Sequence, residues 1–181
     1  MMVLACDTST SVMHLALCRF EEGTLTWFET LSLLSGNRHS ELLMDKILAL
    51  CADAGIRVKE IDLLVTGAGP GSFTGLRISM ATLKGISLAA SIPLVSVPSL
   101  DVWYHSVEQV EQPVLTVIDA KKQRFYTALH QRGERLLGPA DLTVEEIEAV
   151  IAAHPGLLLT GEDAPLLLSR LGRVLPLVQC E

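Results

Sequence analysis

The predicted elements of this chain occur twice in the same order, and this repetition constrains the fold more than any single motif. Alternating apolar residues indicate strands, and apolar residues three and four positions apart indicate helices. In the first half we expect strands at residues 3–6, 12–19 and 24–30, a helix at 39–54, a strand at 61–66, a helix at 76–90 and a strand at 94–97. In the second half we expect strands at residues 113–119, 124–131 and 135–137, a helix at 144–153, a strand at 157–160, a helix at 164–171 and a strand at 174–178.

A duplicated βββαβα unit with mixed strand pairing is typical of the ribonuclease-H-like, actin-type class of α/β folds, in which two lobes face each other across a cleft. We therefore expect a first lobe at residues 1–98 and a smaller second lobe at residues 99–181. Asn37 is a candidate N-cap of the first predicted helix, and Gly55 is its expected stop.

Composition indicates a compact protein with some apolar surface to spare. Hydrophobic residues make up 49% of the chain and charged residues 19%, a balance far from that of disordered chains. The mean hydropathy of +0.40 indicates apolar surface that meets a partner. There is no apolar run of ~18 residues and no secretory leader pattern, so we expect a cytoplasmic protein that does not enter a membrane. The cysteines, Cys6, Cys18, Cys51 and Cys180, have no metal-binding spacing and indicate reduced thiols.

The net charge of −7 argues against direct binding of nucleic acid, because phosphates would repel the isolated chain. Lys121, Lys122 and Arg124 form the one basic cluster. It can be a solvated turn between two strands or a local contact for an anion.

The helix predicted at residues 76–90 lacks the broad polar face of a surface helix, since its only charged residues are Arg77 and Lys84. Such a helix needs cover on both sides. Ala81, Gly85 and Ala89, four residues apart, would allow it to approach the protein's own sheet closely.

Its larger apolar side chains would then face outward. Leu76, Met80 and Leu83 lie on that side, and the preceding helix adds Leu43, Met44 and Ile47. A protein partner or the second lobe could cover this two-helix patch.

Two segments could contact a nucleotide. Asp7 and Thr8 begin a turn after the first strand, and residues 67–75, with Gly69 and Gly71, link a strand to a helix. Free amides at a helix N-terminus can hold an anion. Equally, Asp and Thr are ordinary turn residues, and glycines supply unusual backbone angles. No P-loop pattern follows the glycines, and no cofactor is predicted.

Metal and nucleophilic chemistry find little support. The histidines are isolated and no HExxH pattern occurs, so we expect no metal site. His39, Ser40 and Glu41 could imitate a catalytic group, but Ser and Glu near a helix N-terminus also serve capping.

Four motifs carry a family resemblance. They are Asp7-Thr8-Ser9, Arg38-His39-Ser40-Glu41, the string Gly-Pro-Gly-Ser-Phe-Thr-Gly-Leu-Arg-Ile at residues 69–78, and Ile118-Asp119-Ala120. Their order and spacing resemble the TsaB (YeaZ) family of actin-like proteins over essentially the whole chain. Members of that family usually continue further at the C-terminus, so we expect either a short homologue or a second lobe that is truncated at its C-terminus.

The resemblance implies a scaffold or activator subunit that helps to make N6-threonylcarbamoyladenosine in tRNA. It implies a TsaD-like catalytic partner, a TsaE-like ATPase, self-association as a homodimer when alone, and contact with tRNA only through the complex. The contact residues it implies are His39, Leu43, Met44, Ile47, Leu76, Arg77, Met80, Leu83 and Ser87. Ser99 and Trp103 match the positions of two metal-binding histidines in the catalytic relative, and neither can replace an imidazole.

Two alternatives remain open. The chain could be an independent actin-type ATP-dependent transferase that uses Asp7 and the loop at residues 67–75. A glycoprotease-like peptidase is the other alternative, and the missing histidine pair argues against it.

Overall fold

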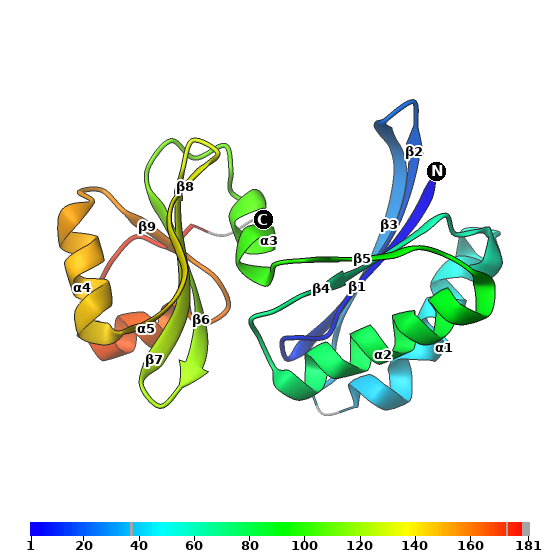
Figure 1. Cartoon of the computed structure of the whole chain (residues 1–181), viewed down its shortest axis with the longest axis horizontal. Helices are drawn as coiled ribbons and strands as arrows, with labels where there is room; N and C mark the ends of the chain where they lie inside the picture. Colours follow the sequence, from blue (N-terminus) through cyan, green and yellow to red (C-terminus); the bar gives the residue numbers. More distant parts are fainter. Residues whose placement is uncertain (37, 173, 179–181) are drawn as a thin grey trace. The chain divides into compact units, whose positions relative to one another are not determined.

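The computed structural model describes residues 1–36, 38–172 and 174–178. The chain divides into two compact units, Met1–Val97 and a second unit that begins at Pro98, and each is described by itself (Figure 1). Within the described residues, no helix is both long and apolar enough to cross a lipid bilayer.

The first unit is built on a five-stranded mixed sheet with the strand order β3-β2-β1-β4-β5. The strands are β1 (Met2–Asp7), β2 (Val12–Glu21), β3 (Thr24–Leu34), β4 (Leu63–Gly67) and β5 (Leu94–Val97). β1, β2 and β3 pair antiparallel through short turns, whereas β4 pairs parallel to β1 and β5 parallel to β4. Parallel neighbours need crossover connections, and these contain α1 (His39–Asp53), the short η1 (Val58–Glu60) and α2 (Phe73–Ala90).

Both long helices, α1 and α2, cover the same face of this sheet (Figure 1). Strand alternation sends every second side chain toward them. Leu4, Leu15 and Leu17 are fully or almost fully buried there. Ile47 from α1 and Leu83 from α2 complete the same core.

The second unit contains a four-stranded sheet with the order β8-β7-β6-β9. Its elements are α3 (Ser99–His105), β6 (Val114–Lys121), β7 (Arg124–Gln131), β8 (Glu134–Thr143), α4 (Val144–Ala153), β9 (Leu158–Thr160) and α5 (Ala164–Leu171). α4 and α5 cover one face, where Leu115, Phe125 and Ile147 are buried. α3 covers the other face, packing Leu100 on Ile118 (Figure 1).

Apart from the added helix α3 and the predicted last strand, the predicted order of the main helices and strands is confirmed, and the chain has the mixed α/β, actin-like architecture expected from it. Several bounds differ, because β3 runs to Leu34, β8 runs to Thr143 and α2 begins at Phe73. The helix α3 was not expected. The predicted strand at residues 174–178 is wrong in extent, since only Leu177 forms a bridge, to Leu159.

At the start of α1, the residue in the cap position is not the one predicted. Asn37, the predicted N-cap, lies outside the described residues. Arg38 occupies the cap position, and its side chain makes no capping hydrogen bond.

Candidate functional site

The glycine-rich loop at residues 67–75 packs tightly against the turn that follows β1. Thr8 Oγ1 donates a hydrogen bond to the Gly75 carbonyl at 2.7 Å, and the Ser72 amide donates to the Ser9 carbonyl at 2.8 Å. A Cβ atom at Gly75 would lie 1.8 Å from the Thr8 carbonyl oxygen, and one at Gly71 would lie 2.7 Å from Ser9 Cβ. These glycines therefore permit a close approach of two backbones.

Some polar groups of this loop and turn that could bind a nucleotide already form hydrogen bonds within the chain. Asp7 Oδ1 accepts a hydrogen bond from the Ser9 amide at 2.6 Å. Ser72 caps α2 by accepting a hydrogen bond from the Gly75 amide at 3.2 Å. Gly69 has a left-handed φ of 88°, which a turn requires and which favours glycine. The arrangement fits a packed strand-to-helix turn.

The face of α2 that packs on the sheet is opposite to the one expected, so that prediction is wrong. The small residues Ala81, Gly85 and Ala89 are exposed, and a Cβ atom at Gly85 would meet nothing within 4 Å. The buried residues of α2 are Gly75, Ser79, Leu83 and Ile86. Ser79 can be buried because its hydroxyl accepts a hydrogen bond from Thr66 Oγ1 at 3.1 Å.

Four of the predicted contact residues lie inside the first unit rather than on its surface. Leu43, Ile47 and Leu83 belong to the core between the helices and the sheet. His39 is also buried, with Nδ1 2.7 Å from Ser35 Oγ and Nε2 3.1 Å from the Thr10 carbonyl oxygen. These side chains fix the helix positions and cannot form the outer surface.

The other predicted contact residues keep some access to solvent. Arg77 and Met44 are exposed, and Leu76, Met80 and Ser87 are half-buried. Ser87 is also occupied within the chain, because its hydroxyl donates a hydrogen bond to the Ile92 carbonyl at 2.6 Å.

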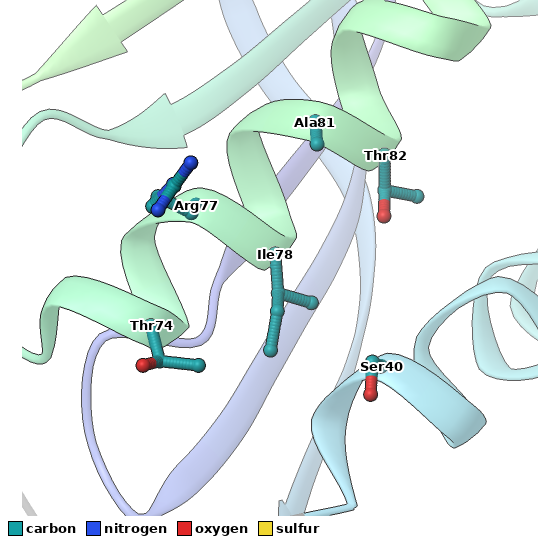
Figure 2. A pocket seen from close by; sticks show the side chains of 6 residues that line it. All are labelled: Ser40, Thr74, Arg77, Ile78, Ala81 and Thr82. Carbon is teal, nitrogen blue, oxygen red and sulfur yellow. The ribbon is translucent and has the colours of Figure 1, made fainter.

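The outward side of α2 and the start of α1 line a groove with a volume of about 410 Å³. Figure 2 shows Arg77, Ile78 and Ala81 along α2 and Ser40 near the start of α1, with the Ser40 hydroxyl pointing away from α2. Its lining residues are Ser40, Thr74, Arg77, Ile78, Ala81 and Thr82. Small and hydroxyl-bearing side chains form most of this lining, so another backbone could approach α2 closely.

Two large apolar side chains extend from the same helix into solvent. Phe73 at its start is 73% exposed, and Leu88 near its end is 85% exposed. The Arg77 guanidinium lies over the Phe73 ring, with Cζ 5.0 Å from the ring centroid. We call the exposed residues Phe73, Arg77, Ala81, Gly85 and Leu88 the outer face of α2.

The basic cluster of the second unit forms the turn between β6 and β7. Lys121 Nζ pairs with Asp119 Oδ2 at 2.9 Å, and Arg124 Nε pairs with Asp141 Oδ1 at 2.9 Å. Burial acts to raise the pKa of Asp119, but the hydrogen bonds from Lys121 outweigh it and lower this pKa overall. The hydrogen bond to Asp119 in turn raises the pKa of Lys121. Two of the three cations are thus neutralised locally, which favours the interpretation as a solvated turn. Lys122 is exposed beside them.

The expected positions of the missing histidines fall on α3. Ser99 is buried and Trp103 is half-buried, and neither carries an imidazole. The described residues contain no group of three or more His, Cys, Asp or Glu side chains that could hold a metal ion.

Sequence reasoning missed a polar cluster beneath α3. His130 of β7 is buried and stacks on Tyr104, with ring centroids 4.2 Å apart. Its Nε2 accepts a hydrogen bond from Arg135 Nε at 3.3 Å, and Arg135 also pairs with Asp101. No local motif could have indicated this cluster, because its members come from three separate elements.

Comparisons with known proteins agree with this architecture. A family model described as "TsaD: tRNA N6-adenosine threonylcarbamoyltransferase" matches residues 33–155. An uncharacterized protein of Mycobacterium tuberculosis is 33% identical over 163 residues, which cover 90% of this chain and 72% of the relative. The tRNA threonylcarbamoyladenosine biosynthesis protein TsaB of Escherichia coli is 31% identical over 154 residues, which cover 83% of this chain.

A solved structure, YeaZ from Pseudomonas aeruginosa, superposes with a TM-score of 0.61 at 29% identity, covering 78% of this chain and 65% of that one. A second structure from that organism, described as similar to the peptidase YeaZ, has a TM-score of 0.69 at 27% identity and covers 87% of this chain and 74% of that one. The chain spans 62% of the length of E. coli TsaB and 43% of an uncharacterized Mycobacterium leprae relative. From the family match, the motifs and these structures together, we conclude that the chain belongs to the TsaD-related family of actin-like proteins, as a member of the TsaB (YeaZ) type.

Proposed function

We propose that this chain takes part in the biosynthesis of threonylcarbamoyladenosine in tRNA as a non-catalytic subunit that binds a TsaD-like catalytic chain. The pathway is the one named for its TsaB relatives. In this proposal the outer face of α2, with the groove beside it, is the contact surface. A TsaE-like ATPase and tRNA join through the assembled complex.

The observation that carries the proposal is the apolar and small-residue character of the outer face. Leu88 is 85% exposed and Phe73 is 73% exposed. Fully burying one such side chain contributes about 1.5–3 kcal/mol. Between Phe73 and Leu88, Ala81 carries only a methyl group and Gly85 has no side chain. A partner segment could therefore pack close to the helix backbone there.

The absence of catalytic groups in this chain is part of the proposal. Ser99 and Trp103 offer a hydroxyl and an indole where the resemblance places metal-binding histidines, and neither replaces a neutral imidazole ligand. The alternative, an independent ATP-dependent transferase, requires the loop at residues 67–75 to bind phosphate. In that loop, Gly71 and Gly75 pack closely against the turn formed by Thr8 and Ser9.

Charge placed on the outer face tests the proposal. Leu88→Glu and Ala81→Glu would each bury a carboxylate in an apolar interface and disturb the close packing there, so we expect at least about 100-fold weaker binding to the TsaD-like protein of the same organism. Leu136→Glu on β8 is the matched control, because Leu136 is an exposed leucine of the second unit. Isothermal titration calorimetry measures the affinity, and urea unfolding checks that each variant folds.

Two results would contradict the proposal. One is a purified TsaD-like protein that fails to bind the wild-type chain. The other is binding that survives both outer-face substitutions at wild-type affinity.

A further inference from the structure

The charges of α2 are all of one sign, in a chain whose overall charge has the other sign. The 18 residues of α2 include Arg77 and Lys84 and no Asp or Glu. The whole chain has 21 acidic residues against 14 lysines and arginines. An isolated positive strip on an acidic protein indicates a partner surface that carries negative charge.

We infer that Arg77 binds a carboxylate of the docked protein partner, and that this ion pair orients the contact made by the outer face of α2. This inference rests on the proposed function, because it concerns the same surface. It adds the chemistry that the partner must present, which is an Asp or Glu side chain beside small or apolar residues.

Three of the described arginines, Arg77, Arg19 and Arg170, form no ion pair, and each lies over an aromatic ring. Of these three, only Arg77 lies on the outer face of α2. Arg38, Arg57, Arg124, Arg132 and Arg135 each form an ion pair with a carboxylate of the chain. Within the described residues, no ion pair is formed by Arg77. Its guanidinium is therefore available, and a planar guanidinium is suited to bind a carboxylate through two parallel hydrogen bonds.

The surroundings hold the guanidinium in place and supply further donors. The Phe73 ring lies under Arg77 at 5.0 Å, and this stacking reduces the freedom that the side chain loses on binding. Thr74 and Thr82 of α2, which carry hydroxyl groups, line the groove beside it (Figure 2). Hydroxyl groups can donate hydrogen bonds to a carboxylate that enters the groove.

Charge also favours a different chain over a second copy for direct packing on α2. If α2 packed against α2 of another copy, Arg77 and Lys84 of both would come together with no acidic residue on either helix. Like charges brought together at an interface are unfavourable. The nearby Glu41 is already paired with Arg38 at 3.0 Å.

The test compares Arg77→Gln and Arg77→Glu with the wild-type chain in binding to the TsaD-like protein. We expect about 10-fold or greater weakening for Arg77→Gln and about 100-fold or greater for Arg77→Glu. Wild-type affinity should fall as salt rises, and Arg77→Gln should show a smaller salt dependence. Arg19→Gln is the matched control, since Arg19 also lies over an aromatic ring, that of Trp27 at 5.9 Å.

The outcomes separate this inference from the proposed function. If both Arg77 variants bind like the wild type while Leu88→Glu does not bind, the carboxylate inference is overturned and the docking surface stands. If the wild-type chain does not bind, or if Leu88→Glu and Ala81→Glu both bind normally, the docking surface itself is wrong and the inference falls with it. Restored binding of Arg77→Glu to a partner with an interfacial Asp or Glu changed to Lys would support the ion pair directly.

Discussion

Two glycines of α2 differ completely in what a methyl group would meet at their positions. At Gly75 a Cβ atom would lie 1.8 Å from the Thr8 carbonyl oxygen, whereas at Gly85 nothing lies within 4 Å. The first glycine keeps the helix in contact with the turn after β1. The second meets no packing requirement within this chain. It lowers helix stability, and no close contact inside the chain compensates for this.

This contrast gives a matched pair of variants in one helix. We expect Gly75→Ala to lower the free energy of unfolding by about 1–3 kcal/mol or more, because the helix must move away from Thr8. Gly85→Ala should raise it by about 0.5–1 kcal/mol through helix propensity. Urea unfolding followed by circular dichroism measures both. Equal effects from the two substitutions would show that the Thr8 contact is not as close as described.

His130 makes the second unit sensitive to pH. Burial lowers the pKa of His130, Arg135 lowers it further, Asp101 opposes this, and His105 adds a small lowering. Tyr104 stacks on the ring. The unfolded chain, in which this histidine has its ordinary pKa of about 6.5, therefore takes up a proton at a higher pH than the folded state does. Just below that pH, His130 is still neutral in the folded state.

The sign of the effect follows from this difference. Stability is fully present above about pH 6.5 and falls as the pH drops toward the lower pKa of the folded state. Each tenfold difference in proton affinity between the states corresponds to about 1.4 kcal/mol. In His130→Gln the decrease in unfolding free energy between pH 7.5 and pH 5 should be smaller, and in His14→Gln, an exposed control, it should be unchanged. An equal decrease in unfolding free energy between pH 7.5 and pH 5 in the wild type and both variants would contradict this account.

At the scale of the elements, the pattern of apolar residues predicts where α2 lies but not which side faces the sheet. Both sides of the helix carry small or apolar residues, so periodicity alone cannot distinguish them. The decision comes from contacts that are distant in sequence. Ser79 is buried because Thr66 of β4 satisfies its hydroxyl, and Gly75 is buried because Thr8 approaches it. Neither partner is visible in the local pattern.

The strands were easier to predict than α3. Alternation along β1 and β2 reflects one covered face of the sheet, which is a local property. α3 has only seven residues, Ser99–His105, too few for a clear helical period. Its stability comes from tertiary contacts such as the hydrogen bond from the Gly133 amide to the Tyr104 hydroxyl at 2.7 Å.

At the scale of the whole molecule, repetition in the sequence corresponds to repetition in the structure. Each unit has three antiparallel strands followed by a parallel strand and covering helices. This order could be read from the sequence because both halves show the same succession of periods. The candidate surface could be predicted only in part. Arg77 and Met44 are exposed as expected, whereas Leu43, Ile47 and Leu83 are core residues, since burial depends on packing between elements.

The central claim is that another polypeptide covers the outer face of α2, and thiol labelling in a reconstituted complex tests it directly. Ala81→Cys places a reactive thiol on that face, and Leu136→Cys places one on β8 as a control. The native thiols should react slowly, because burial and then Asp7 raise the pKa of Cys6 to about 12, and burial raises the pKa of Cys18 and Cys51. Cys180 is replaced by Ser in both variants.

Each variant is labelled alone and with an excess of the TsaD-like protein. We expect the partner to slow labelling of Ala81→Cys at least about 10-fold and to leave Leu136→Cys unchanged, because only the first site becomes covered. A complex that forms while the Ala81→Cys thiol reacts at its free rate would contradict the claim.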